Sequence, residues 1–112
     1  MFGFRKQDAH REIGPVELEA MLKGGKALLI DVREAAEFAT GHIPGAINMP
    51  LSAFSPRDIP DPEGRTVVLQ CAGGRRSGQA LDQCARAQAA VDTHLAGGIA
   101  AWKDAGFPLA VG

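Results

Sequence analysis

One short stretch combines a nucleophile with residues that attract anions. Residues 71–77 read CAGGRRS and follow the apolar run TVVLQ. A cysteine thiolate is a strong nucleophile, glycines let a backbone turn sharply, and arginines bind anionic groups. The stretch therefore predicts a loop that binds or attacks an anion through Cys71. The alternative is an inert, buried cysteine at the end of a strand, followed by a simple turn.

The reactivity of Cys71 depends on how far its thiol pKa is lowered. A free thiol with a pKa near 8.5 is only about 3% thiolate at neutral pH. Lowering this pKa by about two units takes roughly 2.7 kcal/mol, and a helix end contributes only about 0.3–1 kcal/mol. We expect inward-pointing backbone N–H groups, together with the charges of Arg75 and Arg76, to supply the rest.

The elements that position this stretch alternate between strand and helix patterns. Apolar runs or alternating residues predict strands, and alanine-rich or amphipathic segments predict helices between them. This alternation indicates an α/β domain with a mainly parallel sheet. The expected strands are 27–32, 46–49, 66–71 and 91–95, and the expected helices are 14–25, 33–41, 77–90 and 99–106.

This order places Cys71 at the carboxyl end of a strand and Ser77 at the start of the next helix. In α/β sheets, chemistry collects at the carboxyl ends of the strands. Gly73 and Gly74 tolerate positive φ, so the turn can aim N–H groups inward as an anion-binding nest, and Ser77 can cap the helix.

Size and charge limit the classes of function. A chain of 112 residues with a net charge of −1 predicts one domain, residues 1–112, with a loosely ordered N-terminus over 1–10. This charge gives no reason to expect nucleic-acid or membrane partners. Two cysteines and no export signal favour a reducing compartment, the cytoplasm.

Several other residues are interpreted as structural. Cys84 shares a helical face with Leu81 and is expected in the core. Asp31 and Arg33 flank a strand end, where an internal ion pair or backbone hydrogen bonds would hold the loop. Trp102 is expected in the core.

The remaining polar and aromatic candidates give weaker signals. His42 is expected to brace a turn, while His10 and His94 are scattered, so no metal site and no cofactor are expected. Phe2 and Phe4 lie in the terminal segment and are expected to be loosely docked.

Three stretches together resemble the single-domain rhodaneses, a family of sulfurtransferases. DVREAAEFATGHIPGAIN (31–48) looks like the first family signature, CAGGRRS fits the active-site pattern, and LAGGIAAWKDAGFPL (95–109) is similar to the closing signature. The resemblance covers nearly the whole chain, and it implies a three-layer fold with a central parallel sheet flanked by helices.

The resemblance also implies a mechanism. Cys71 would attack a small anionic sulfur donor such as thiosulfate, become a persulfide, and pass the sulfur to cyanide, a thiol or a protein acceptor. Residues 72–77 (Ala72, Gly73, Gly74, Arg75, Arg76 and Ser77) would bind the donor, with Arg76 as the motif arginine and Arg75 favouring anionic donors.

Two alternative functions remain open. The chain could be a rhodanese-fold carrier or sensing module that works with a protein partner. The second alternative is a phosphatase, since fold relatives place five residues between cysteine and arginine. Here four residues separate Cys71 from Arg76, which resembles the sulfur-transfer version.

Some positions depart from the family pattern. Gly73 stands where a serine is often found, and Gln70 stands where an apolar or aromatic residue is common. Gln88 stands where a helix-ending glycine is usual. These departures predict lower activity at most.

Overall fold

The structure, a computed structural model, describes residues 10–112. The expectations for the N-terminus, including Phe2 and Phe4, lie outside the described residues except at His10. The His10 side chain lies 3.0 Å from the carboxylate of Asp82, so this residue is held against the domain.

A parallel sheet of five strands forms the centre of the domain. The strand order is β1-β5-β4-β2-β3, and every adjacent pair is parallel. All of β2 and most of β4 are buried, as their apolar runs predict for central parallel strands. The bounds are β1 Arg11–Ile13, β2 Ala27–Asp31, β3 Ile47–Asn48, β4 Thr66–Gln70 and β5 Thr93–Leu95.

The sequence-based strands are confirmed in position, but β1 was missed. It contains only three residues, and two of them are exposed and charged. It pairs with β5 alone, at the edge of the sheet. Such a short edge strand has no hydrophobic pattern for sequence reasoning to detect.

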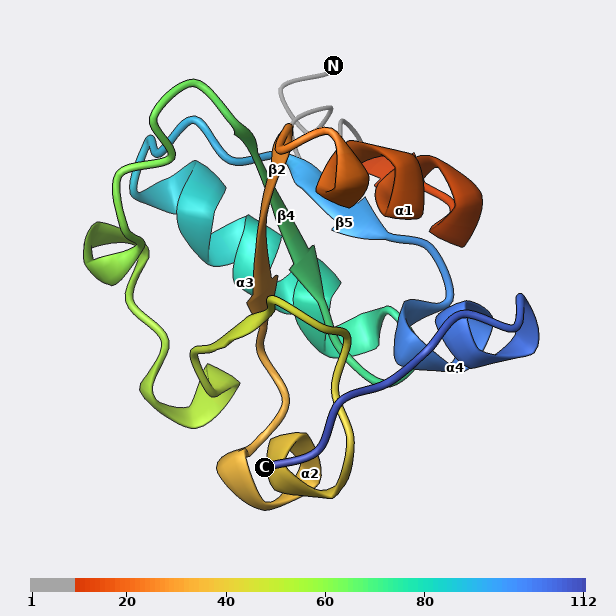
Figure 1. The fold of residues 1–112 in the computed structure, drawn as a ribbon. Helices are drawn as coiled ribbons and strands as arrows, with labels where there is room; N and C mark the ends of the chain where they lie inside the picture. The colour runs from red at the N-terminus through yellow and green to blue at the C-terminus, as the bar shows by residue number, and fades with distance from the viewer. Residues whose placement is uncertain (1–9) are drawn as a thin grey trace.

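Helices cover both faces of the sheet and complete three layers (Figure 1). Leu18 of α1 and Trp102 of α4 pack in one apolar cluster, while Leu81 and Cys84 of α3 pack in the other. The three-layer α/β fold is therefore confirmed. The bounds are α1 Pro15–Lys23, α2 Ala35–Thr40, α3 Arg75–Arg86 and α4 Gly98–Asp104, with 3-10 turns at Leu51–Ala53 and Pro56–Asp58.

The α3 helix differs from its predicted bounds at both ends. It begins at Arg75 rather than at Ser77, because Gly74 adopts the left-handed conformation and acts as the N-cap. It ends at Arg86, and Gln88 then adopts a positive φ of 59°. A glutamine thus occupies the conformation that glycine adopts most easily.

Candidate functional site

Cys71 follows the last residue of β4, at the carboxyl edge of the sheet. Ala72 and Gly73 lead from it to Gly74, where the chain reverses with φ 108° and enters α3. Of the two glycines in the loop that tolerate positive φ, only Gly74 adopts one. Ser77 lies in the first turn of α3 and is not its cap, which corrects the expectation for this residue.

The sulfur of Cys71 is surrounded by hydrogen-bond donors. The backbone N–H of Gly74 donates to Sγ at 3.0 Å, and the Ser77 hydroxyl oxygen lies 3.6 Å from Sγ. Burial acts most strongly on the pKa of the Cys71 thiol and raises it. The N–H and hydroxyl of Ser77 and the N–H groups of Gly74 and Gly73 lower this pKa and together outweigh burial, so the net shift is downward.

The N-terminus of α4 holds the carbonyl side of the same loop. The N–H of Ile99 donates to the carbonyl of Cys71 at 2.8 Å, and the N–H of Ala100 donates to that of Ala72 at 3.2 Å. Gly98 makes this approach possible, since a Cβ there would lie 2.3 Å from the carbonyl oxygen of Cys71. The double glycine lies in the stretch LAGGIAAWKDAGFPL (95–109), and the sequence alone indicates no contact for it with the Cys71 loop.

The two arginines of the loop lie in different surroundings. Arg75 is exposed at the first residue of α3. The guanidinium of Arg76 donates to both carboxylate oxygens of Glu37 in α2, at 2.7 and 3.0 Å. The hydrogen bond from Arg76 lowers the pKa of Glu37 to about 2. The N–H groups of Gly73, Gly74 and Ser77 and the Ser77 hydroxyl are therefore the main groups that lower the pKa of the Cys71 thiol, while Arg76, paired with Glu37, adds an electrostatic interaction with Cys71.

Asp31 and Arg33 form a buried ion pair at the end of β2. The Arg33 guanidinium donates to the Asp31 carboxylate at 2.8 and 3.1 Å, and also to the carbonyl of Gly41 at 2.7 Å. Asn48 of β3 donates to the carbonyls of both residues. These contacts fix the segment between β2 and α2, which carries Glu37 toward Arg76.

His94 belongs to the same neighbourhood, which sequence reasoning missed. Its Nδ1 lies 2.8 Å from the hydroxyl oxygen of Ser77, although seventeen positions separate the two residues. Both side chains are buried. The sequence signal was that His94 lies in a predicted strand. In the structure this strand, β5, pairs with β4, so its side chains lie close to the loop and the helix that follow β4.

The other candidates lie apart from this loop. Cys84 is fully buried in the core, as predicted, and burial raises its pKa to about 11. The Nδ1–H of His42 donates to the Phe38 carbonyl, and the His42 ring stacks on the Phe38 ring with centroids 3.9 Å apart. Among residues 10–112, no group of three or more His, Cys, Asp or Glu side chains is arranged to hold a metal ion.

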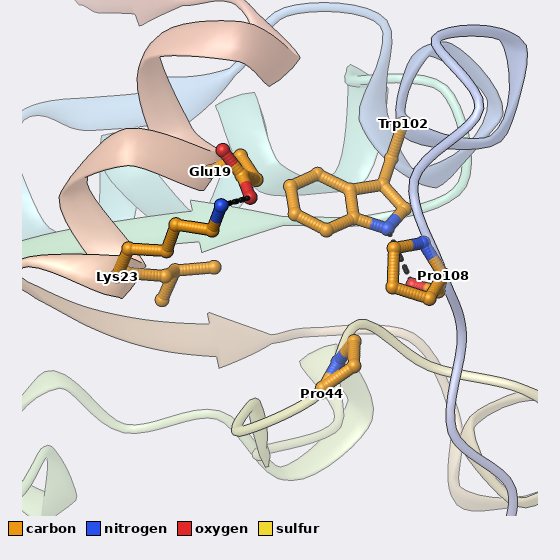
Figure 2. A pocket seen from close by; sticks show the side chains of 6 residues that line it. Glu19, Lys23, Pro44, Trp102 and Pro108 are labelled. Atoms are coloured by element: carbon orange, nitrogen blue, oxygen red, sulfur yellow. Dashed lines mark hydrogen bonds and ion pairs between the residues drawn. The ribbon is translucent and has the colours of Figure 1, made fainter.

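A separate pocket lies between α1, α4 and the loop around Pro44 (Figure 2). Its volume is about 160 Å³, and Trp102 forms one wall. Lys23 pairs with Glu19 across its rim at 3.2 Å, and the Trp102 ring N–H donates to the Pro108 carbonyl. None of the Cys71 loop residues lines it, and it is smaller than the roughly 300 Å³ at which small-molecule sites begin.

The fold and the loop define a class of protein. A parallel α/β domain presents one cysteine, with a lowered pKa, at the carboxyl end of a central strand and against a helix N-terminus. The Rhodanese-like domain family matches residues 14–105, and the chain belongs to this family.

Known proteins similar to this chain agree with the assignment. A sulfurtransferase of Allochromatium vinosum is 38% identical over 82 residues, which are 73% of this chain and 77% of that protein. An uncharacterized Synechocystis protein is 43% identical over 96 residues, 86% of this chain and 54% of that protein. The solved thiosulfate sulfurtransferase of Pseudomonas aeruginosa superposes with a TM-score of 0.82 at 27% identity, over 96% of this chain and 21% of that one.

The lengths of these relatives differ from that of this chain. It spans about half of the Synechocystis protein and about a fifth of the Pseudomonas one. No helix within the described residues is long and apolar enough to cross a membrane.

Proposed function

We propose that the protein is a sulfurtransferase that carries sulfane sulfur on Cys71. The Cys71 thiolate attacks the outer sulfur of thiosulfate or a related persulfide donor, and the donor's sulfur–sulfur bond breaks. With thiosulfate, sulfite leaves with the bonding electrons and Cys71 becomes a persulfide. Cyanide or a thiol then attacks the outer sulfur, and Cys71 departs as a thiolate. The reaction needs no cofactor.

The environment of the Cys71 sulfur is the observation that supports this proposal most. The Gly74 N–H at 3.0 Å and the donors of Ser77 stabilise negative charge on Sγ. The thiolate is the attacking form of cysteine, so these donors raise the fraction that can react. The same loop would hold the charged outer sulfur of the persulfide, and exposed Arg75 would attract the anionic donor.

Two features disfavour phosphatase chemistry. Four residues separate Cys71 from Arg76, which gives a smaller ring than the five-residue spacing of the phosphatases this fold resembles. A phosphatase also needs an acid to protonate the leaving group. Of two candidate acids, Asp31 is fully buried and paired with Arg33, whereas Asp58 is exposed in the 3-10 turn Pro56–Asp58.

The thiol chemistry supports a cytoplasmic setting for the protein. Both cysteines are free, and a reactive thiol is kept reduced in the cytoplasm. We place the protein there, with a small anionic donor and either a thiol or a protein as the sulfur acceptor.

Thiocyanate formation tests the proposal. The wild-type protein should convert thiosulfate and cyanide to thiocyanate through many turnovers and should leave aryl phosphates intact. Cys71→Ser should be inactive, whereas Cys84→Ser, the matched control, should retain activity. A single turnover that stops after one sulfur per chain would indicate a carrier that needs a partner protein. Aryl phosphate hydrolysis that is lost in Cys71→Ser would contradict the proposal.

A further inference from the structure

A line of polar side chains runs from the Cys71 sulfur to the surface. Sγ lies 3.6 Å from Ser77 Oγ, and Ser77 Oγ lies 2.8 Å from His94 Nδ1. On the other side of the ring, Nε2 of His94 lies 3.3 Å from the carboxylate of Glu12 in β1. Ser77 and His94 are buried, while the Glu12 side chain is 62% exposed. The line therefore connects a buried thiol with solvent.

The partners define which atom donates at each step. An ionised carboxylate only accepts, so Glu12 at 3.3 Å favours the tautomer in which Nε2 of His94 carries the proton and Nδ1 accepts, and the relay uses this tautomer. In this tautomer the Ser77 hydroxyl donates to Nδ1 at 2.8 Å, a shorter contact than its alternative hydrogen bond to the Gly74 carbonyl at 3.2 Å. The Ser77 oxygen remains free to accept the proton of the Cys71 thiol. Along this line from Cys71 through Ser77 to His94, each group donates to the next one toward Glu12.

We propose that His94 is a positioning residue that takes up, through Ser77, the proton that Cys71 releases when its thiolate forms. This inference rests on the proposed role of Cys71 as the nucleophile. The thiol proton passes to Ser77 Oγ as the serine proton passes to His94 Nδ1, so serine ends unchanged. The products are a thiolate and an imidazolium, which Glu12 faces. The same path returns the proton when the thiol re-forms.

The groups around His94 fit an acceptor that is neutral before the reaction. Burial keeps the pKa of His94 below its usual range, and Glu12 acts in the opposite direction. His10 packs edge-on against the ring with centroids 6.1 Å apart, and Asp82 of α3 lies 3.0 Å from His10. A neutral imidazole accepts a proton, and a new thiolate nearby favours the charged ring.

The relay predicts a particular pH profile for the reactivity of Cys71. Below the pKa of His94 the imidazolium stabilises the thiolate, so the thiol is more acidic there than at high pH. A positive charge this near shifts a pKa by at least about one unit. Plotted as logarithm of rate against pH, alkylation of Cys71 should show two rising limbs joined by a bend. The lower limb should lie about tenfold above that of a variant without the imidazole.

The experiment compares alkylation by iodoacetamide across pH in proteins that all carry Cys84→Ala, with mass spectrometry locating the label on Cys71. His94→Asn should lose the bend and react about tenfold more slowly at low pH, yet match the parent at high pH. His10→Asn, the matched control, should keep the bend. A merely structural role for His94 would lower the rate by the same factor at every pH.

A second variant covers the case in which His94→Asn does not fold. Glu12→Gln changes an exposed side chain and removes the charge that faces the imidazolium, so the bend should move to lower pH. An unchanged bend in Glu12→Gln, or parallel profiles for His94→Asn and its parent, would overturn the proposal. Alkylation needs no sulfur donor, so this result is separate from the sulfur-transfer test, which the proposed function fails if thiocyanate formation is absent.

Discussion

Replacing Gly98 with alanine should displace the Cys71 loop, because Gly98 lies at the start of α4, directly against the backbone of Cys71 and Ala72. Gly98 has φ 58°, and an added Cβ would lie 2.3 Å from the Cys71 carbonyl oxygen and 2.6 Å from the Ala72 carbonyl. Real Cβ contacts stay above 3.0 Å, so the loop and α4 must separate by about 0.7 Å or more. This movement weakens the hydrogen bonds that Ile99 and Ala100 donate to the loop.

The expected magnitudes follow from these contacts. Weakening two backbone hydrogen bonds costs about 1 kcal/mol each, and alanine at a positive φ costs about 1 kcal/mol more. Gly98→Ala should therefore lower the free energy of unfolding by about 3 kcal/mol. A displacement approaching 1 Å at a catalytic group costs up to about 10²-fold in rate, so persulfide formation should slow by about 10- to 10²-fold.

Gly106→Ala provides the matched control. Gly106 has φ 85°, but its added Cβ would meet nothing within 4 Å. It should cost only the backbone strain of about 1 kcal/mol and leave the reaction rate unchanged. Urea unfolding and the rate of persulfide formation from thiosulfate measure both quantities. If Gly98→Ala matches Gly106→Ala in stability and in rate, the close packing of α4 on the loop does not govern Cys71.

Three further predictions concern stability. Burial raises the Cys84 pKa from about 9 to about 11, so the contribution of the neutral thiol to the free energy of unfolding is full below pH 9 and is lost as the pH rises through 11. Cys84→Ala should therefore make the free energy of unfolding in urea depend less on pH across this range. An equally steep loss in the variant would refute the assignment. Glu37 has its pKa lowered from 4.5 to about 2 by Arg76, so its contribution is present above pH 4.5 and is lost as pH falls through 2. This side chain is 40% exposed, so Glu37→Gln should remove about 1 kcal/mol or less of that acid dependence, and an unaltered acid profile would count against the ion pair. Gln88→Gly should raise the free energy of unfolding by up to about 1 kcal/mol, and with it the midpoint of thermal unfolding, because Gln88 holds φ 59°. A lower midpoint would contradict this reasoning.

The sequence predicted the fold well because the fold depends on local patterns. The apolar runs that became β2 and β4 are long enough to identify buried parallel strands. The turn after Cys71 was expected from its glycines, although only Gly74 needs a positive φ. The edge strand β1 has too few residues to show a pattern.

The contacts between distant parts of the chain were beyond sequence reasoning. Arg76 meets Glu37 across 39 positions, and Ser77 meets His94 across 17. Neither spacing carries a signal, because only the order of strands and the packing of helices brings these side chains together. For this reason the sequence predicts that the charges of Arg75 and Arg76 lower the pKa of the Cys71 thiol, and it indicates no role for His94.

The most direct test of the central claim is the mass of the protein after incubation with thiosulfate. Nucleophilic attack by Cys71 predicts one added sulfur, about 32 Da, on the peptide that contains Cys71. Cys84→Ser should gain the same mass, and Cys71→Ser should gain none. An adduct located on Cys84 alone, or no adduct on Cys71 under conditions in which thiocyanate forms, would contradict the assignment of Cys71 as the sulfur carrier.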